Sequence, residues 1–187
     1  YYLAVLRNPE RMAETGLDYV SFMALIGSLF VVAGGIHIRI RGQSTPLSNT
    51  VLLAVGAVAS NFLGTTGASM IMIRPFLRAN KHRLRAFHIV FFIFLVGNIG
   101  GALTPIGDPP LFLGYLKGIP FFWVLENVWQ IWLIAVAALV LLFLLLDHLS
   151  FRRYKAKRPA EEFHEDADVG GLYNLLFVGI ILLSVFI

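Results

Sequence analysis

Long apolar runs constrain this chain more than any other feature of its sequence. Several of them approach or exceed the ~20 residues that a helix needs to cross the hydrocarbon core of a bilayer. The runs are continuous rather than alternating, a pattern that disfavours a β-barrel. Lipid offers no partner to a free backbone N–H or C=O group, so a spanning segment must be helical. The sequence therefore predicts an all-α, polytopic integral membrane protein.

The composition agrees with a membrane protein. Hydrophobic residues make up 58% of the chain and charged residues 14%, whereas a soluble domain carries about a quarter charged residues. The absence of cysteine excludes disulfides, thiolate metal sites and cysteine nucleophiles. No secretory signal peptide is recognisable. The chain starts without Met and stops inside an apolar run, so we expect a piece of a longer protein, truncated at both ends.

We expect one transmembrane domain over residues 1–187. The stretch before residue 17 is amphipathic and is expected to form an interfacial or loop segment. Two of the membrane segments contain polar, glycine-rich interruptions. The expected segments are 17–36, 47–77 (broken), 86–117 (broken), 127–147 and 171–187, the last cut short by the end of the sequence.

The distribution of basic residues predicts the topology. Lys and Arg are densest at 78–85 and 152–158, so both loops are expected on the cytoplasmic side. One broken crossing and the 127–147 helix between them give the even number of crossings that this requires. The loop at 37–45 has two Arg residues and leaves two alternatives open. Segment 47–77 is either a re-entrant hairpin or a single broken crossing.

The two interruptions are the strongest functional signal. We call residues 60–67 (SNFLGTTG) the first break and residues 97–110 (GNIGGALTPIGDPP) the second break. Unwound backbone at membrane depth is tolerated only where protein or a water-filled cavity covers it. The N-terminus of a half-helix attracts anions, and the C-terminal carbonyls suit cations. Paired Gly/Pro-interrupted spans therefore indicate the binding site of a secondary transporter.

The polar side chains at the breaks are candidate ligands. Their oxygens suit Na⁺ or hydrogen bonds to a carboxylate or oxyanion. Asp108 is the only acidic residue between Asp18 and Glu126, and a carboxylate at membrane depth is a functional candidate by default. Of these candidates, Asn61, Thr65, Asn98, Thr104 and Asp108 are the possible Na⁺ ligands, and no other metal is assigned. The expected binding residues are Ser60, Asn61, Thr65, Thr66, Ser69, Asn98, Gly101, Thr104 and Asp108.

Structural roles for the same residues stay open. Ser and Thr often back-bond to helical carbonyls, and Gly often permits close helix packing. Asp108 is equally well placed as a helix N-cap ahead of Pro109. We interpret the histidines, His88 among them, as interfacial residues. Trp123, Trp129 and Trp132 fit an interfacial aromatic belt. The basic loops determine topology and do not predict a nucleic-acid partner.

The second break resembles the signature loop of the ion transporter superfamily. That group includes NhaD-type sodium:proton antiporters, arsenite efflux permeases, the melanosomal P protein and citrate–metal transporters. The match covers the residues of the motif GNIGGALTPIGDPP, and it is much more specific than a lone glycine motif. Residues 60–75 resemble the other typical region of the group, in which a Ser-rich break precedes a half-helix that ends in Pro. The resemblance covers residues 17–146, as an N-terminal or central fragment.

The resemblance implies half of an inverted-repeat transporter with broken helices and re-entrant hairpins around a midplane site. It also implies that Gly101 and the polar residues of both breaks contribute to that site. One departure matters. Many members carry an Asp-Asn pair in the first break, where this chain has Gly64-Thr65. Asp108 is therefore the chief titratable candidate.

These observations predict a secondary active transporter that resembles a sodium:proton antiporter and works by alternating access. A sodium-coupled carrier of a carboxylate such as citrate, or of an oxyanion such as arsenite, is the alternative within transport. An intramembrane enzyme or a membrane scaffold is the alternative from other classes; no HExxH or GxSxG motif supports an enzyme. The expected partners are the lipid bilayer, a small ion or anionic solute, and a second copy in a homodimer. No cofactor is expected beyond Na⁺ or H⁺ as coupling ion. The expected location is a bacterial inner membrane.

Overall fold

A computed structural model describes residues 9–39, 45–155, 168–171 and 173–185. The expected all-α, polytopic class is confirmed. Within the described residues, the only strands are two short segments that pair antiparallel, with Ile38 opposite Val169. The elements are α1 (Pro9–Gly34), β1 (His37–Arg39), α2 (Pro46–Ala79), α3 (Ala86–Phe92), the π-helix η1 (Ile93–Asn98), the 3-10 helix η2 (Ile99–Gly101), α4 (Pro109–Leu116), α5 (Trp123–Lys155), β2 (Asp168–Gly170) and α6 (Asn174–Ser184).

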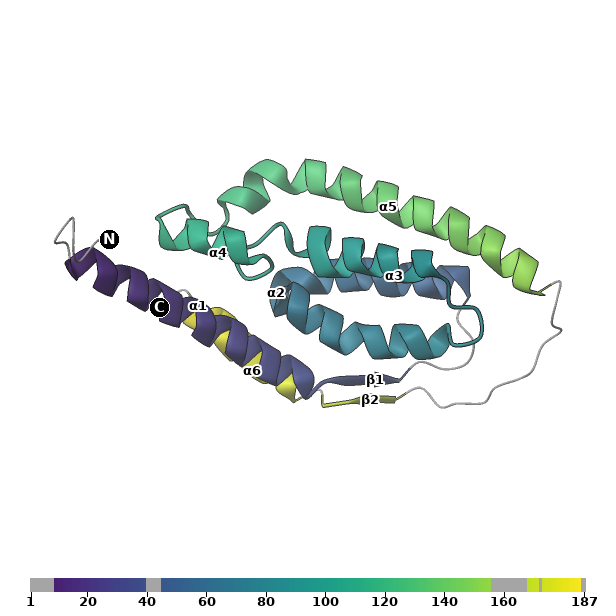
Figure 1. Cartoon of the computed structure of the whole chain (residues 1–187), viewed down its shortest axis with the longest axis horizontal. Helices are drawn as coiled ribbons and strands as arrows, with labels where there is room; N and C mark the ends of the chain where they lie inside the picture. Colours follow the sequence, from purple (N-terminus) through teal and green to yellow (C-terminus); the bar gives the residue numbers. More distant parts are fainter. Residues whose placement is uncertain (1–8, 40–44, 156–167, 172, 186–187) are drawn as a thin grey trace.

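Helix α2 is a hairpin of two antiparallel arms. Straight, its 34 residues would extend over about 50 Å. Instead, the Asn49 amide near its start donates a 2.8 Å hydrogen bond to the Asn80 side-chain oxygen just past its end. Gly56 and Met72 also face each other across the arms. Figure 1 shows the fold-back next to the α2 label. Of the two alternatives that the sequence left open for 47–77, the chain adopts the hairpin.

The chain ends of this hairpin lie at the basic end of the molecule. Arg83, in the loop after α2, forms an ion pair with Asp147 near the C-terminal end of α5. Figure 1 shows the β1–β2 ribbon and the end of α5 on the same side as this loop. The other end carries an exposed ion pair between Lys117 and Asp18. Residues 78–85 and the described part of the second predicted loop, 152–155, therefore lie at one end of the molecule, as the positive-inside rule requires of two cytoplasmic loops.

The second broken segment runs in one direction along the molecule. It passes from α3 through η1 and η2, makes turns over residues 102–107, and resumes as α4 (Figure 1). Helix α5 then returns along it. The π-helix marks where the regular ladder gives way, which is common at functional sites.

The main core lies between the α2 hairpin, α3 with η1, and α5. Phe143 of α5 is completely buried and its ring centroid lies 5.6 Å from that of Phe91 and 6.5 Å from that of Phe76. Phe76 also packs on Phe92 at 5.5 Å. A smaller cluster joins α1 to the second break and α4 through Leu25, Leu29, Ile106 and Phe112. The hairpin tip lies between these two clusters.

Much of the remaining surface is apolar. In the described part of the chain, α1 and α5 are long and apolar enough to cross a membrane, whereas the 34 residues of α2, although apolar enough, are divided between two arms. Large apolar side chains are well exposed, for example Ile134 at 70% and Leu176 at 68%. Contiguous apolar surface of this kind marks contact with lipid or with further protein. Helix α1 begins at Pro9, well before the span predicted from residue 17, so the amphipathic stretch continues the helix instead of forming a separate segment.

Candidate functional site

Gly64 alone interrupts the helical backbone of α2. Its φ of 72° and ψ of 155° lie in a region that residues with a Cβ rarely adopt. Residues on both sides of it remain helical, so the first break is a single-residue pivot and not the unwound stretch of 60–67 that the sequence predicted. Fewer backbone groups are freed than expected. What the pivot does create is a new helix N-terminus at Thr65.

Asn61 joins the hairpin tip to the second break. Its amide nitrogen donates to the carbonyl of Gly100 at 2.7 Å, and its amide oxygen accepts the backbone N–H of Leu103 at 3.1 Å. The side chain is buried, with 6% of its surface exposed. Both functional ends of the amide are therefore occupied by backbone. In this conformation Asn61 holds the two breaks together.

Thr104 makes the reciprocal connection. Its hydroxyl donates to the Asn61 carbonyl at 2.6 Å and accepts the Gly107 N–H at 3.0 Å. Thr65 adds a third bond, since its backbone N–H donates to the Gly107 carbonyl at 3.2 Å. The second break thus closes into a compact loop that packs on the hairpin tip.

Two glycines permit this closure. A Cβ on Gly107 would overlap the Gly101 carbonyl oxygen and lie 2.8 Å from the Gly101 Cα. A Cβ on Gly101 would lie 2.5 Å from the Gly107 oxygen and 2.7 Å from Cγ2 of Thr65. The predicted site residue Gly101 therefore contributes close backbone approach.

Ser60 joins the first hairpin arm to η1. Its buried hydroxyl lies 2.8 Å from the carbonyl oxygens of both Gly56 and Val96.

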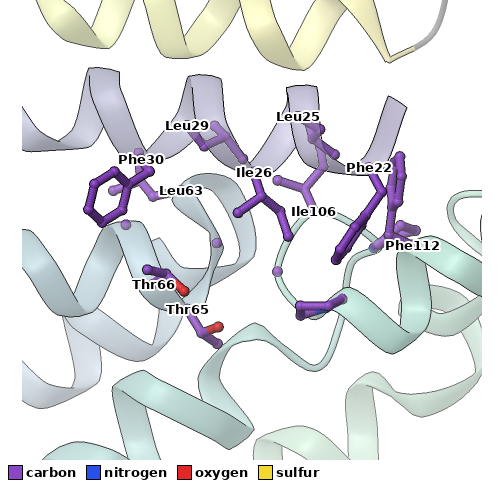
Figure 2. A pocket seen from close by; sticks show the side chains of 15 residues that line it. Phe22, Leu25, Ile26, Leu29, Phe30, Leu63, Thr65, Thr66, Ile106 and Phe112 are labelled. Atoms are coloured by element: carbon purple, nitrogen blue, oxygen red, sulfur yellow. The ribbon is translucent and has the colours of Figure 1, made fainter. Parts of the chain in front are cut away.

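A narrow cleft opens between this junction and α1 (Figure 2). Phe22, Leu25 and Ile26 of α1 cover one side, while Thr65 and Thr66 lie on the other. Its floor includes the start of the second α2 arm over 64–67, the end of the second-break loop at Gly107, and Pro109, the first residue of α4. Two helix N-termini therefore border one cleft, and the dipole of each places a partial positive charge there. Pro109 and Pro110 carry no N–H, so the first two residues of α4 contribute no hydrogen-bond donor. The cleft has a volume of ≈ 30 Å³, above the ~10–15 Å³ needed to hold one water, so it suits one small polar group.

A larger hollow also borders the junction. It has a volume of ≈ 420 Å³ and reaches Asn61 and Thr104, but its other walls are apolar, including Phe62, Leu103 and Trp132. The polar atoms of Asn61 and Thr104 are already hydrogen-bonded within the junction. A carboxylate or an ion placed there would lose hydration without gaining partners. The cleft beside α1 is the better candidate site.

Asp108 is the N-cap residue of α4, in an extended conformation with Pro109 at the first helical position. Its carbonyl accepts the N–H groups of Leu111 and Phe112, but its carboxylate makes no capping hydrogen bond. Among the described residues this half-buried carboxylate has no hydrogen bond or ion pair. The capping interpretation is therefore correct for the backbone, and the carboxylate remains available to a cation.

The predicted site residues fall into two groups. Ser60, Asn61, Thr65, Gly101 and Thr104 meet at the junction. Asn98 does not join them: it is exposed and donates locally to the Ile93 carbonyl at 3.1 Å. Ser69 lies further along the second arm, beside Gly97. The exposed Thr66 lines the cleft, and the half-buried Asp108 immediately precedes Pro109, which also lines it. The assignment of these residues to ion binding remains a prediction.

The sequence interpretation missed Trp132. Instead of belonging to an interfacial belt, its half-buried indole N–H donates to the Ile99 carbonyl at 2.7 Å. Trp132 lies more than two turns inside α5, which begins at Trp123. That depth is the signal that separates it from Trp123 and Trp129, which stay about half exposed, at 50% and 46%.

The sequence did not predict the burial of His88, and Asp147 was overlooked. Both side chains are completely buried, and His88 Nε2 lies 3.1 Å from Asp147 Oδ1. Asp147, and not Asp108, is thus the most deeply buried acid in the described part of the chain. Its position at the end of a Leu-rich run resembled an ordinary helix end next to a charged loop.

The fold and its broken-helix junction define an integral membrane protein of the transporter class. A protein-family model described as "Putative citrate transport" matches residues 2–187, and the chain belongs to this family. The match agrees with the resemblance to the ion transporter superfamily, which includes citrate transporters, and favours transport over the enzyme and scaffold alternatives. No curated protein and no solved structure gives a significant match to the chain.

Proposed function

We propose that this chain forms part of a cation-coupled secondary transporter for a carboxylate anion of the citrate class. The observation that carries the proposal is that two half-helix N-termini and the Thr65 and Thr66 side chains border one cleft. Such a site favours an anion, and paired half-helix termini at broken spans are how transporters hold substrate carboxylates. The family membership supports the same substrate class.

The cleft is the size of one polar group, so it would receive a single carboxylate of a larger acid. Asp108 would receive the coupling cation, Na⁺ or H⁺. Its carboxylate is half-buried and unpaired among the described residues, and a cation there would offset its repulsion of the substrate. Sodium:proton exchange without an organic substrate is the second candidate, because an unpaired carboxylate can bind either ion.

The first prediction concerns Asp108→Asn in the intact protein reconstituted into proteoliposomes. The parent is expected to take up radiolabelled citrate when a Na⁺ or pH gradient is applied. This uptake is expected to fall at least tenfold in the variant, since the amide cannot neutralise a bound cation. Binding of citrate at saturating cation is expected to weaken far less. A matched control is Asp18→Asn, at the exposed pair on α1.

Three outcomes separate the candidates. Gradient-driven citrate uptake that needs Asp108 supports the proposal. Sodium-dependent proton movement, seen with a pH-sensitive dye and indifferent to citrate, would favour the antiporter. Unchanged citrate uptake in Asp108→Asn would remove the coupling role from this residue.

A further inference from the structure

A buried polar cluster lies at the basic end of the molecule, far from the candidate site. We call its members Asn49, Asn80, Arg83, His88 and Asp147 the basal clamp. They come from both ends of the α2 hairpin, the following loop, α3 and α5. The exposed fraction is 2% for Asn49 and 0% for Asn80, His88 and Asp147.

Asp147 is the centre of the clamp. Its Oδ2 accepts the Asn49 amide at 2.8 Å and Arg83 Nη2 at 3.0 Å, and its Oδ1 accepts Arg83 Nη1. His88 Nδ1 accepts the backbone N–H of Arg85 at 3.2 Å, so the proton must be on Nε2, which donates to Oδ1 at 3.1 Å. Both oxygens of the carboxylate are thus engaged by protein donors. The clamp leaves no open position for a transported ion.

The two asparagines lock the hairpin arms together. Asn49 Nδ2 donates to Asn80 Oδ1 at 2.8 Å, and Asn80 Nδ2 donates back to Asn49 Oδ1 at 2.9 Å. Asn49 also carries the bond to Asp147. The base of the hairpin is therefore tied to α5 through side chains alone.

Helix α5 reaches the candidate site as well, through the Trp132 bond to the Ile99 carbonyl. Trp132 and Asp147 are separated by about 22 Å of helix, and Asn49 and Asn61 by about 18 Å of the first hairpin arm. At the tip of that arm, Asn61 donates to the carbonyl of Gly100, the residue next to Ile99. The first hairpin arm and α5 are thus joined directly at the base and, at the tip, through the neighbouring carbonyls of Ile99 and Gly100.

We propose that the basal clamp and Trp132 are positioning elements for transport: α5 is a strut that sets the place of the hairpin tip against the second break. The proposal rests on the proposed function for its transport readout. Buried ion pairs are weak evidence for stability, and their best-attested use is to specify register. An apolar base would let the hairpin slide along α5, whereas the clamp defines one register for the tip.

The double variant Asp147→Asn with Arg83→Gln separates positioning from stability. Asp147→Asn alone leaves the buried Arg83 guanidinium without a carboxylate partner and is expected to lower the melting temperature. The double variant is neutral and keeps hydrogen-bonding groups, so most of that loss should be recovered. Its KM for citrate is nevertheless expected to stay at least fivefold above that of the parent, because Asn and Gln cannot re-form the two-point contact of the Arg83 guanidinium with both Asp147 oxygens. A KM that returns to the parent value together with the melting temperature would overturn the proposal.

Trp132→Phe tests the other end of the strut if the double variant does not fold. It removes the indole N–H together with part of the ring system, and the Ile99 carbonyl keeps the N–H of Ala102 at 3.2 Å. We expect a raised KM with at most a small fall in melting temperature, since Trp132 is only partly buried against the core. Trp129→Phe, on an exposed face of the same helix, is the control and should change neither quantity. An unchanged KM in Trp132→Phe would overturn the proposal.

A distance measurement makes the test independent of the transported substrate. The chain has no cysteine, so spin labels can be placed at Phe62→Cys near the tip and Leu145→Cys on α5, both exposed. Pulsed electron spin resonance should give one narrow distance distribution in the parent and a broadened one in the double variant and in Trp132→Phe. A distribution that stays narrow in both variants would overturn the strut. If citrate is not transported at all, this measurement still decides the positioning role.

Discussion

Replacing Gly107 by alanine is expected to abolish transport and to lower the free energy of unfolding by about 3 kcal/mol, the upper end for an overpacked site. The added Cβ would overlap the Gly101 carbonyl oxygen and lie 2.8 Å from its Cα. These neighbours are backbone atoms. They are further constrained because the adjacent Gly100 carbonyl is bound to Asn61 and the Gly107 carbonyl to the Thr65 N–H. The loop can therefore relax only by leaving the hairpin tip.

The matched control is Gly16→Ala in α1, where a Cβ would meet nothing within 4 Å. In an exposed helix interior, alanine is favoured over glycine by roughly 0.5–1 kcal/mol, so a small gain in stability is expected. Denaturant titration in detergent and citrate uptake give the two readouts. A Gly107→Ala protein that transports at the parent rate would contradict the closed geometry of the second break.

Asp147→Ala is expected to cost about 3–5 kcal/mol of unfolding free energy, because it leaves the Arg83 guanidinium buried without its carboxylate. Asn49 and His88 lose their common acceptor in the same step. The cation–π contact of Arg83 with the ring of Phe151, at 5.2 Å, does not replace a carboxylate. The loss should appear as a large fall in the denaturant midpoint.

The exposed pair at the other end of the molecule provides the comparison. Lys117 Nζ lies 3.2 Å from the Asp18 carboxylate, and the Lys117 side chain is 70% exposed. Asp18→Ala is expected to cost less than about 1 kcal/mol, the usual range for a surface ion pair. Equal losses of unfolding free energy in Asp18→Ala and Asp147→Ala would show that burial does not set the strength of the basal clamp, and would contradict this prediction.

The membrane class and the positions of both breaks could be predicted from the sequence, because Gly, Pro and polar residues within apolar runs are local signals. The fold-back of α2 could not. Hydropathy is the same for a hairpin and for a broken crossing, and what distinguishes them is a contact between Asn49 and Asn80 across 31 positions. The extent of the first break was overestimated for a related reason: Ser and Thr are compatible with helix, and only Gly64 leaves it.

Residue type predicted which side chains belong to the candidate site, but it did not predict which of them would bind backbone and which would stay available to a ligand. Asn61 and Thr104 looked like ligands because they carry oxygens in a glycine-rich setting. The structure uses those oxygens to bind backbone across the two breaks. Asp147 was missed because an acid near a helix end is ordinary in sequence, and only the packing of α2, α3 and α5 shows that it is buried.

The central claim is that an anion binds in the cleft between α1 and the junction of the hairpin tip with the second break. Because the chain lacks cysteine, a single Thr66→Cys substitution reports on this cleft directly through its rate of reaction with a maleimide. Ser48→Cys, exposed at the base of the same hairpin, is the control. Citrate with the coupling cation is expected to slow the reaction at Thr66→Cys and leave Ser48→Cys unchanged. An unchanged rate at Thr66→Cys, or equal slowing at both positions, would contradict the account.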